Sequence, residues 1–195
     1  MKEEFNIEEI KHYSKLDQYF DYINISEHTL KEVLEEINEE IQSIDDELRT
    51  MKENVFADNE EENIYMKDVY FPKINRMLKL KLGLLNKNIK GLKEQFEKSL
   101  KLVFQKCDIK INNTGEDAFI PYINYAKDNL KIQIDKNLYD SLHILYRMDI
   151  DELKSEEDLS KTYREVEEIY NEAVYFTASL LKESCDILYN KKHRK

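Results

Sequence analysis

The residues of this chain with the clearest chemical potential are four carboxylates near its C-terminus. Glu168 and Glu172 are four positions apart, and Glu183 and Asp186 are three apart, so the members of each pair share one face of a helix. Carboxylate oxygens are preferred ligands of hard divalent cations, and a cation held in this way can activate water for hydrolysis. The four residues are therefore a candidate metal centre.

Their spacing resembles that of the magnesium ligands in all-α nucleotide pyrophosphohydrolases. The resemblance implies a carboxylate–metal nucleotide hydrolase in which all four residues hold the ion. Those enzymes place the two acid pairs on separate antiparallel helices. Here no helix breaker separates Glu172 from Glu183, so a single helix carries both pairs about 16 Å apart. A solvated acidic face is the better interpretation, and the hydrolase remains the third-ranked alternative.

Other signatures of catalysis are missing from the sequence. It has no P-loop, nucleophile elbow, Gly-rich dinucleotide motif or zinc-binding cysteine pair, and its three glycines give little scope for close backbone contact with a phosphate. Cys107 and Cys185 have no activating group nearby in the sequence, and we expect both to be free thiols of a reducing cytoplasm. We therefore expect a protein that is not an enzyme and needs no cofactor.

The aromatic residues indicate candidate binding surfaces. The chain has 13 tyrosines and eight phenylalanines, and tyrosine is favoured where one edge of the ring is packed and the other is wet, at core margins and at protein interfaces. Core margin is the simpler interpretation, and the interface is its competitor. The predicted partner contacts are Tyr65, Tyr70 and Phe71 near the tip of a hairpin, and Phe119, Tyr122 and Tyr125 between two strands.

The composition indicates the elements that must position these residues. Three glycines and two prolines in 195 residues favour long helices with few turns. Three heptad patterns, at 30–55, 78–103 and 159–187, predict the long helices, and Thr29 to Glu32 reads as a capping box at the start of the first. The first two patterns are joined by 56–71, which we expect to be a loop with room for one helical turn.

The predicted fold is mainly α, a helical bundle with a long antiparallel coiled-coil hairpin and a small two-stranded β element. The strands are expected at 107–112 and 130–135, where apolar and polar residues alternate. The whole chain, 1–195, is expected to be a single domain. Its parts are an N-terminal helix (1–26), the hairpin (27–106), the β element (107–137), C-terminal helices (138–190) and a basic tail (191–195).

Charge is segregated between the two predicted hairpin helices. Residues 27–56 hold ten acids and three bases, whereas 73–106 hold ten bases and two acids. Opposite charges beside a heptad seam set the pairing of coiled-coil helices, so we expect the two helices to pair through these charges. The formal net charge of −11 disfavours direct binding to nucleic acid or to an anionic membrane.

These observations rank the possible functions. The first is a non-enzymatic scaffold or adaptor in the cytoplasm, which binds a protein partner or forms a homodimer. The second is an acidic inhibitor that mimics nucleic acid and blocks a host or phage-defence nuclease, through negative faces at 27–47 and 156–172. The carboxylate–metal hydrolase is the third. The sequence contains no run of about 18 apolar residues, which a membrane-spanning helix would require.

Overall fold

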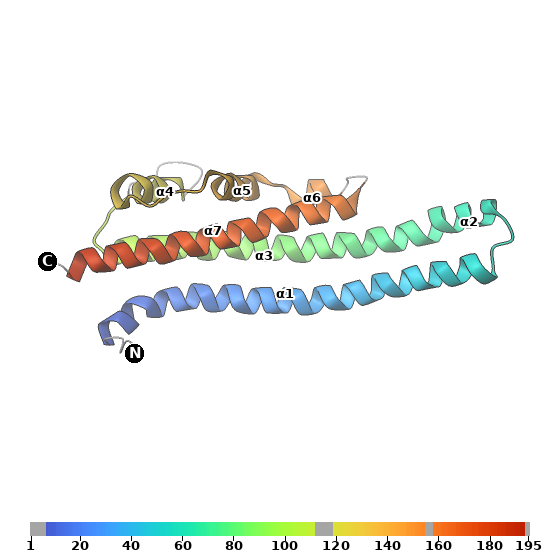
Figure 1. The fold of residues 1–195 in the computed structure, drawn as a ribbon, viewed down its shortest axis with the longest axis horizontal. Coiled ribbons are helices and arrows are strands. Elements are labelled where there is room, and N and C mark those ends of the chain that lie inside the picture. The colour runs from blue at the N-terminus through green and yellow to red at the C-terminus, as the bar shows by residue number, and fades with distance from the viewer. Residues whose placement is uncertain (1–6, 112–118, 155–157, 194–195) are drawn as a thin grey trace. The chain divides into compact units, whose positions relative to one another are not determined.

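The computed structural model describes residues 7–111, 119–154 and 158–193, and these residues are helical almost throughout (Figure 1). The prediction of a mainly helical protein is confirmed. Two of the helices, η1 and η2, are single π-helical turns, which widen the helix locally. The elements in chain order are α1 (Ile7–Asn54), α2 (Asn59–Tyr65), η1 (Met66–Tyr70), α3 (Phe71–Lys106), α4 (Ile120–Tyr125), η2 (Ala126–Leu130), α5 (Lys136–Arg147), α6 (Ile150–Leu153) and α7 (Leu159–His193).

The chain divides into two compact units, and the residues of α1, α3 and α7 are shared between them. Unit 1 comprises Met1–Ile25, Ile89–Met148 and Glu168–Lys195, and unit 2 comprises Ser26–Asn88 and Asp149–Glu167.

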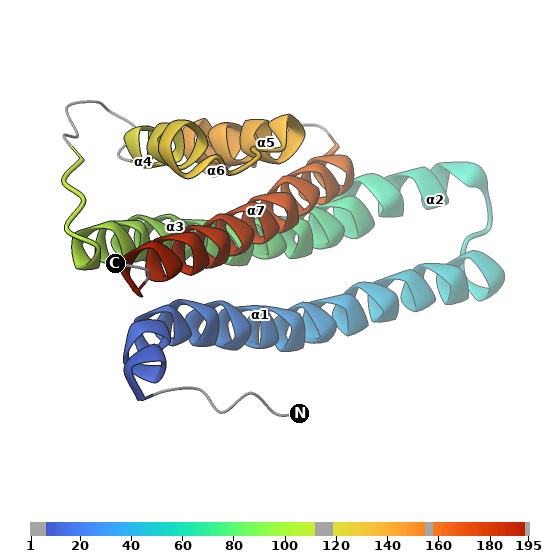
Figure 2. The same cartoon turned by 60° about the vertical axis from the view of Figure 1, so that its left-hand side comes forward.

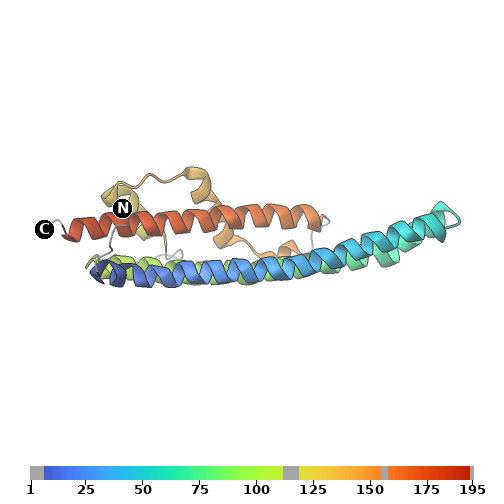
Figure 3. The same cartoon turned by 60° about the horizontal axis from the view of Figure 1, so that its bottom comes forward.

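Unit 2 is an antiparallel hairpin of α1 and α3, whose ribbons run side by side (Figures 1 and 3). Hydrogen bonds between the two helices show the direction, because residue numbers rise on one helix as they fall on the other. The pairs are Lys73 with Glu47, Lys81 with Asn38, and Asn88 with the carbonyl oxygen of Ser26.

The apolar seam of the hairpin is buried on the α3 side. Leu82 and Leu85 are fully buried, and on α1 the facing Ile37 and Ile41 are half-buried. The first turns of α7 belong to the same unit. There the Lys81 ammonium lies 4.2 Å from the centre of the Tyr163 ring, and burial lowers the pKa of Lys81.

Unit 1 packs the remaining parts of α1, α3 and α7 with α4 and α5 (Figure 2). Its core includes Tyr19, Phe96 and Leu142, all essentially inaccessible to solvent. Polar contacts join its helices: Tyr19 to Thr177, Ser141 to Glu172, and Tyr146 to the carbonyl oxygen of Lys93.

Several sequence-based boundaries differ from the structure. Helix α1 continues through residue 26, because no glycine or proline interrupts residues 7–54. The capping-box interpretation of Thr29 to Glu32 is wrong, since both residues lie inside this helix. The segment 56–71 is largely helical and contains α2 and η1. The tail 191–195 is described only as far as His193, where α7 ends.

The prediction of a two-stranded β element is wrong, since the described residues contain no strand. Helix α3 ends in a Schellman motif. The N–H of Ile109 bonds the carbonyl oxygen of Phe104, and Asp108 between them has a left-handed φ of 58°. A second left-handed residue, Lys131, has φ 62° and ends η2. Each expected strand therefore contains a helix C-cap.

The alternation that suggested strands nevertheless corresponds to a real pattern of burial. Leu130 and Ile132 are buried and Ile134 is half-buried, whereas Lys131 and Gln133 are exposed. An extended chain packed on one side against helices produces the same period of two as a strand in a sheet. Periodicity reports which side chains are buried, and it says nothing about backbone pairing.

Candidate functional site

In the hairpin tip, residues 53–71, a helix cap fixes the start of α2. The Asp58 carboxylate accepts hydrogen bonds from the backbone N–H groups of Glu60 and Glu61 at 2.9 and 3.0 Å, and the Glu61 carboxylate accepts one from the N–H of Ala57 at 2.9 Å. Such reciprocal bonds satisfy donors that a helix start would leave unpaired. The chain therefore turns from α1 into α2 (Figure 1) with a defined backbone.

Polar contacts with α1 hold the tip and the start of α3 in place. Tyr70 donates a 2.7 Å hydrogen bond to Asp45, Lys73 pairs with Glu47 at 2.8 Å, and Lys52 pairs with Glu62 at 2.7 Å. These contacts connect α1 to α2, η1 and α3 in turn. The tip is thus held at several points along its length.

The same contacts shift proton affinities. Hydrogen bonds from Lys73 and Tyr65 lower the pKa of Glu47, because both stabilise the carboxylate form. The pKa of Lys73 is raised by its bond to Glu47. The pKa of Tyr70 is raised because its proton is held by Asp45. Each group is thus stabilised in the ionisation state that it has at neutral pH.

The predicted contact residues of the tip differ in availability. Tyr65 and Tyr70 are half-buried, and their hydroxyl groups are engaged by Glu47 and Asp45. The Tyr65 ring also packs against Phe56 with centroids 5.4 Å apart. These two tyrosines brace the hairpin. Phe71 is 49% exposed and presents its ring to solvent.

Two exposed apolar residues of the tip were missed by sequence reasoning. Val55 and Ile64 are 57% and 56% exposed. Val55 was assigned to the end of the heptad seam, and Ile64 follows a run of acids that suggested a loop. The signal that could have found Ile64 is its place as an isolated apolar residue in a strongly capped acidic helix. With Phe71 they are the large apolar residues that the tip exposes, and the three are called its apolar surface below.

The second predicted contact cluster lies in the core of unit 1. Phe119 is 0% and Tyr122 8% exposed, and Tyr125 is half-buried. The rings of Tyr122 and Tyr125 each pack edge-on against Phe104, with centroids 5.3 and 5.5 Å apart. Phe119 and Tyr122 consequently offer almost no surface to a partner.

The four carboxylates of the candidate metal centre lie on one uninterrupted helix, α7. Glu168 and Glu183 are exposed, and Glu172 accepts a hydrogen bond from the Ser141 hydroxyl. No group of three or more metal-ligating side chains occurs in the part of the chain that the structure describes. The geometry gives the four acids no common point at which to hold an ion.

The predicted charge pairing between α1 and α3 holds at one end only. Lys73 with Glu47 is the single ion pair between these helices among residues 26–88. The α1 side chains that hydrogen-bond α3 are Asn38 and Glu47, which flank the seam at heptad positions e and g. Exposed charges that make no ion pair with any described residue include Glu36, Glu39, Arg76, Lys79 and Lys87.

Comparison of the chain with protein-family models, with curated proteins and with solved structures found no match. Among the described helices, none combines the length and the apolar character required to cross a bilayer.

Proposed function

We infer that this protein is a non-enzymatic adaptor that binds a protein partner through its hairpin tip. The observation that carries the proposal is the exposure of Val55, Ile64 and Phe71, each about half accessible, on a tip fixed by a helix cap and three polar contacts to α1. Apolar side chains held on an ordered scaffold lose little entropy when a partner covers them.

The charge around these side chains indicates the chemistry of the partner. The exposed acids of the tip are Glu53, Asp58, Glu60, Glu61 and Asp68, against one exposed base, Lys67. A complementary surface has an apolar centre bordered by lysine or arginine. Burying the exposed parts of three such side chains contributes roughly 2–4 kcal/mol, which corresponds to roughly a 30- to 800-fold gain in affinity.

The hairpin is proposed to be a coiled coil in the strict sense, so that it acts as a stiff arm that presents the tip. In support, the heptad positions Leu78, Leu82 and Leu85 of α3 are buried, and the α1 contacts lie at flanking positions. A cytoplasmic location accords with two cysteines that form no disulfide.

The test substitutes the exposed apolar residues of the tip and leaves Tyr65 and Tyr70, whose hydroxyl groups bond to α1, unchanged. The triple variant Val55→Gln, Ile64→Gln, Phe71→Gln is compared with wild type in affinity capture from the source cells, followed by measured binding of the captured protein. The matched control, Ile25→Gln, Ile144→Gln, Tyr175→Gln, removes three apolar residues of unit 1 that are exposed to a similar or greater extent. We expect the tip variant alone to lose the partner. Equal retention by both variants, or no specific partner for wild type, refutes the proposal.

A second candidate function is the acidic mimic of nucleic acid that inhibits a nuclease. The observation that favours it is that Glu36 and Glu39 of α1 are exposed and make no ion pair with α3. Such a complex is predominantly electrostatic, so it weakens steeply with salt and is displaced by duplex DNA. Binding that is unchanged between low and high salt excludes this mode.

A further inference from the structure

A shallow groove lies on unit 2 next to the tip. It has a volume of about 480 Å³ and is lined by Pro72, Asn75, Arg76, Lys79 and Leu80 of α3 and by Lys154 at the end of α6. The five α3 residues follow the spacing of one helix face. The groove therefore extends along the outer surface of α3, beginning where the tip ends.

The groove combines an apolar floor with cations. Leu80 is 49% exposed, and Arg76 and Lys79 are exposed and make no hydrogen bond or ion pair with any described residue. Residues 73–93 contain no acid, so α3 itself offers these cations no counter-charge.

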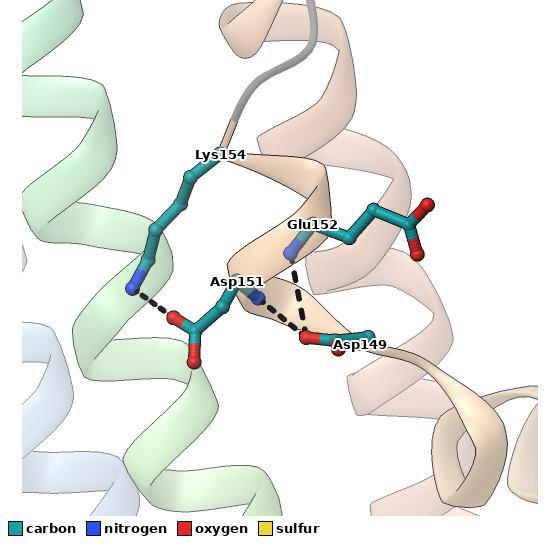
Figure 4. A network of polar contacts seen from close by, with 4 residues as sticks. All are labelled: Asp149, Asp151, Glu152 and Lys154. Carbon is teal, nitrogen blue, oxygen red and sulfur yellow. Dashed lines mark hydrogen bonds and ion pairs between the residues drawn. The ribbon is translucent and has the colours of Figure 1, made fainter.

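Lys154 is positioned by the short helix α6. Its ammonium group pairs with Asp151 at 2.6 Å, and the Asp149 carboxylate caps the helix by accepting from the N–H groups of Asp151 and Glu152 (Figure 4). The lysine therefore forms a wall of the groove with its charge already partly balanced. Arg76 and Lys79 are the cations that remain for an incoming anion.

The tip and the groove have complementary properties. The tip offers exposed acids, including Glu53 and Glu60, and the exposed apolar Ile64, which lies one helical turn after Glu60. The groove offers Arg76 and Lys79 beside Leu80. The two surfaces follow one another directly in the chain, since the tip ends at residue 71 and the groove begins at 72. A surface that carries adjacent patches of opposite charge is complementary to a copy of itself related by a two-fold axis.

We propose that two copies of this chain form a symmetric dimer in which the tip of each lies in the groove of the other. The dimer rests on the proposed function, because it names a second copy as the partner that covers the tip. Its charges set the pairing, and the apolar residues Ile64 and Leu80 are covered on association.

Charge reversal tests the dimer, with molar mass measured by light scattering after gel filtration at low salt. The groove variant Arg76→Glu, Lys79→Glu places acids opposite an acidic tip, and the tip variant Glu53→Lys, Glu60→Lys places bases opposite a basic groove. Each alone is expected to be monomeric, with its dimer dissociation constant raised at least about tenfold. An equimolar mixture of the two restores the dimer, because both contacts then join opposite charges.

Two control variants change the same number of charges elsewhere: Lys87→Glu, Lys90→Glu on α3, and Glu36→Lys, Glu39→Lys on α1. Both are expected to remain dimeric. A wild-type chain that is monomeric at about 100 μM, where even weak specific dimers are populated, overturns the dimer, as does a mixture that stays monomeric or a mass that grows beyond two chains. If wild type is monomeric but the glutamine tip variant still loses an external partner, the dimer fails and the adaptor proposal stands. If wild type is monomeric and the glutamine tip variant keeps its external partner, both the dimer and the adaptor proposal fail.

Discussion

The Tyr22 side chain of α1 occupies the space that a β-carbon on Gly91 of α3 would need. Both residues belong to unit 1, and the close approach explains a glycine in the middle of a 36-residue helix, where it costs about 1 kcal/mol relative to alanine. Around the other glycine of that helix, Gly83, no described atom outside its chain neighbours and the adjacent helix backbone lies within 4 Å of a would-be β-carbon. Only one of the two glycines is required by packing.

The two glycines provide a matched pair of substitutions. Gly83→Ala should raise the free energy of unfolding by roughly 0.5–1 kcal/mol, because alanine lowers the entropy of the unfolded chain and fits the open space. Gly91→Ala should lower it by roughly 1–3 kcal/mol, because Tyr22 has to move. Urea unfolding followed by circular dichroism measures both. Stabilisation by Gly91→Ala would show that Tyr22 moves aside at no cost.

The heptad patterns predicted the buried faces of α3 and α7, whereas most seam positions of α1 are only half-buried and Val55 is 57% exposed. The apolar seam positions of α3 from Leu78 to Val103 are buried, and so are those of α7 from Leu159 to Leu180. The stabilisation from burial is proportional to apolar area, and apolar residues on a helix recur with the helical period, so the buried face can be recognised in a single sequence. The helix ends could not be recognised, because the left-handed caps at Asp108 and Lys131 carry no glycine to mark them.

A second matched pair concerns hydroxyl groups on α7. Ser184 Oγ is buried and makes no hydrogen bond to any residue that the structure describes, so Ser184→Ala removes an uncompensated polar group and should stabilise the protein by about 1 kcal/mol. The Thr177 hydroxyl donates to the carbonyl oxygen of Val174 and also bonds Tyr19. Thr177→Val loses both bonds and should destabilise by roughly 1–3 kcal/mol. Calorimetric melting of the two variants measures the contrast, and equal melting temperatures would contradict it.

Charge was harder to predict from sequence than apolar burial. The net charges of the hairpin helices count side chains at all seven heptad positions, whereas only those at e and g flank the seam. Glu36 and Glu39 occupy outer positions and point to solvent, so they add to the total and not to the pairing. Exposure of the tip residues was hard to predict for a similar reason. Composition cannot separate Tyr70, whose hydroxyl is bonded to Asp45, from Phe71, which is exposed.

The two cysteines should react at very different rates. Burial, followed by the nearby Asp186 and Cys107, raises the pKa of Cys185 to about 12, so at pH 8 only about one molecule in ten thousand carries the reactive thiolate. Cys185 is also 2% exposed, whereas Cys107 is half-buried. Titration with a thiol-reactive disulfide should label Cys107 in the native protein and Cys185 only after unfolding. The Cys107→Ser variant should show no fast phase, and a fast phase in that variant would contradict the burial of Cys185.

The Lys73–Glu47 pair should make the hairpin sensitive to acid and to strong base. The lowered pKa of Glu47 means that its contribution is complete above the ordinary value of 4.5 and is lost as pH falls through the folded pKa. The raised pKa of Lys73 means that its contribution is complete below 10.5 and is lost as pH rises through the folded pKa. The pair therefore stabilises the tip throughout the window between the two.

Glu47→Gln isolates this contribution, since glutamine keeps the size of the side chain without its charge. The melting temperature of wild type should exceed that of Glu47→Gln at neutral pH, and the difference should vanish below the folded pKa of Glu47. Glu39→Gln, at an exposed position without an ion pair among the described residues, serves as the control and should follow wild type at every pH. A difference that persists into strong acid would assign the effect of Glu47 to packing and not to its charge.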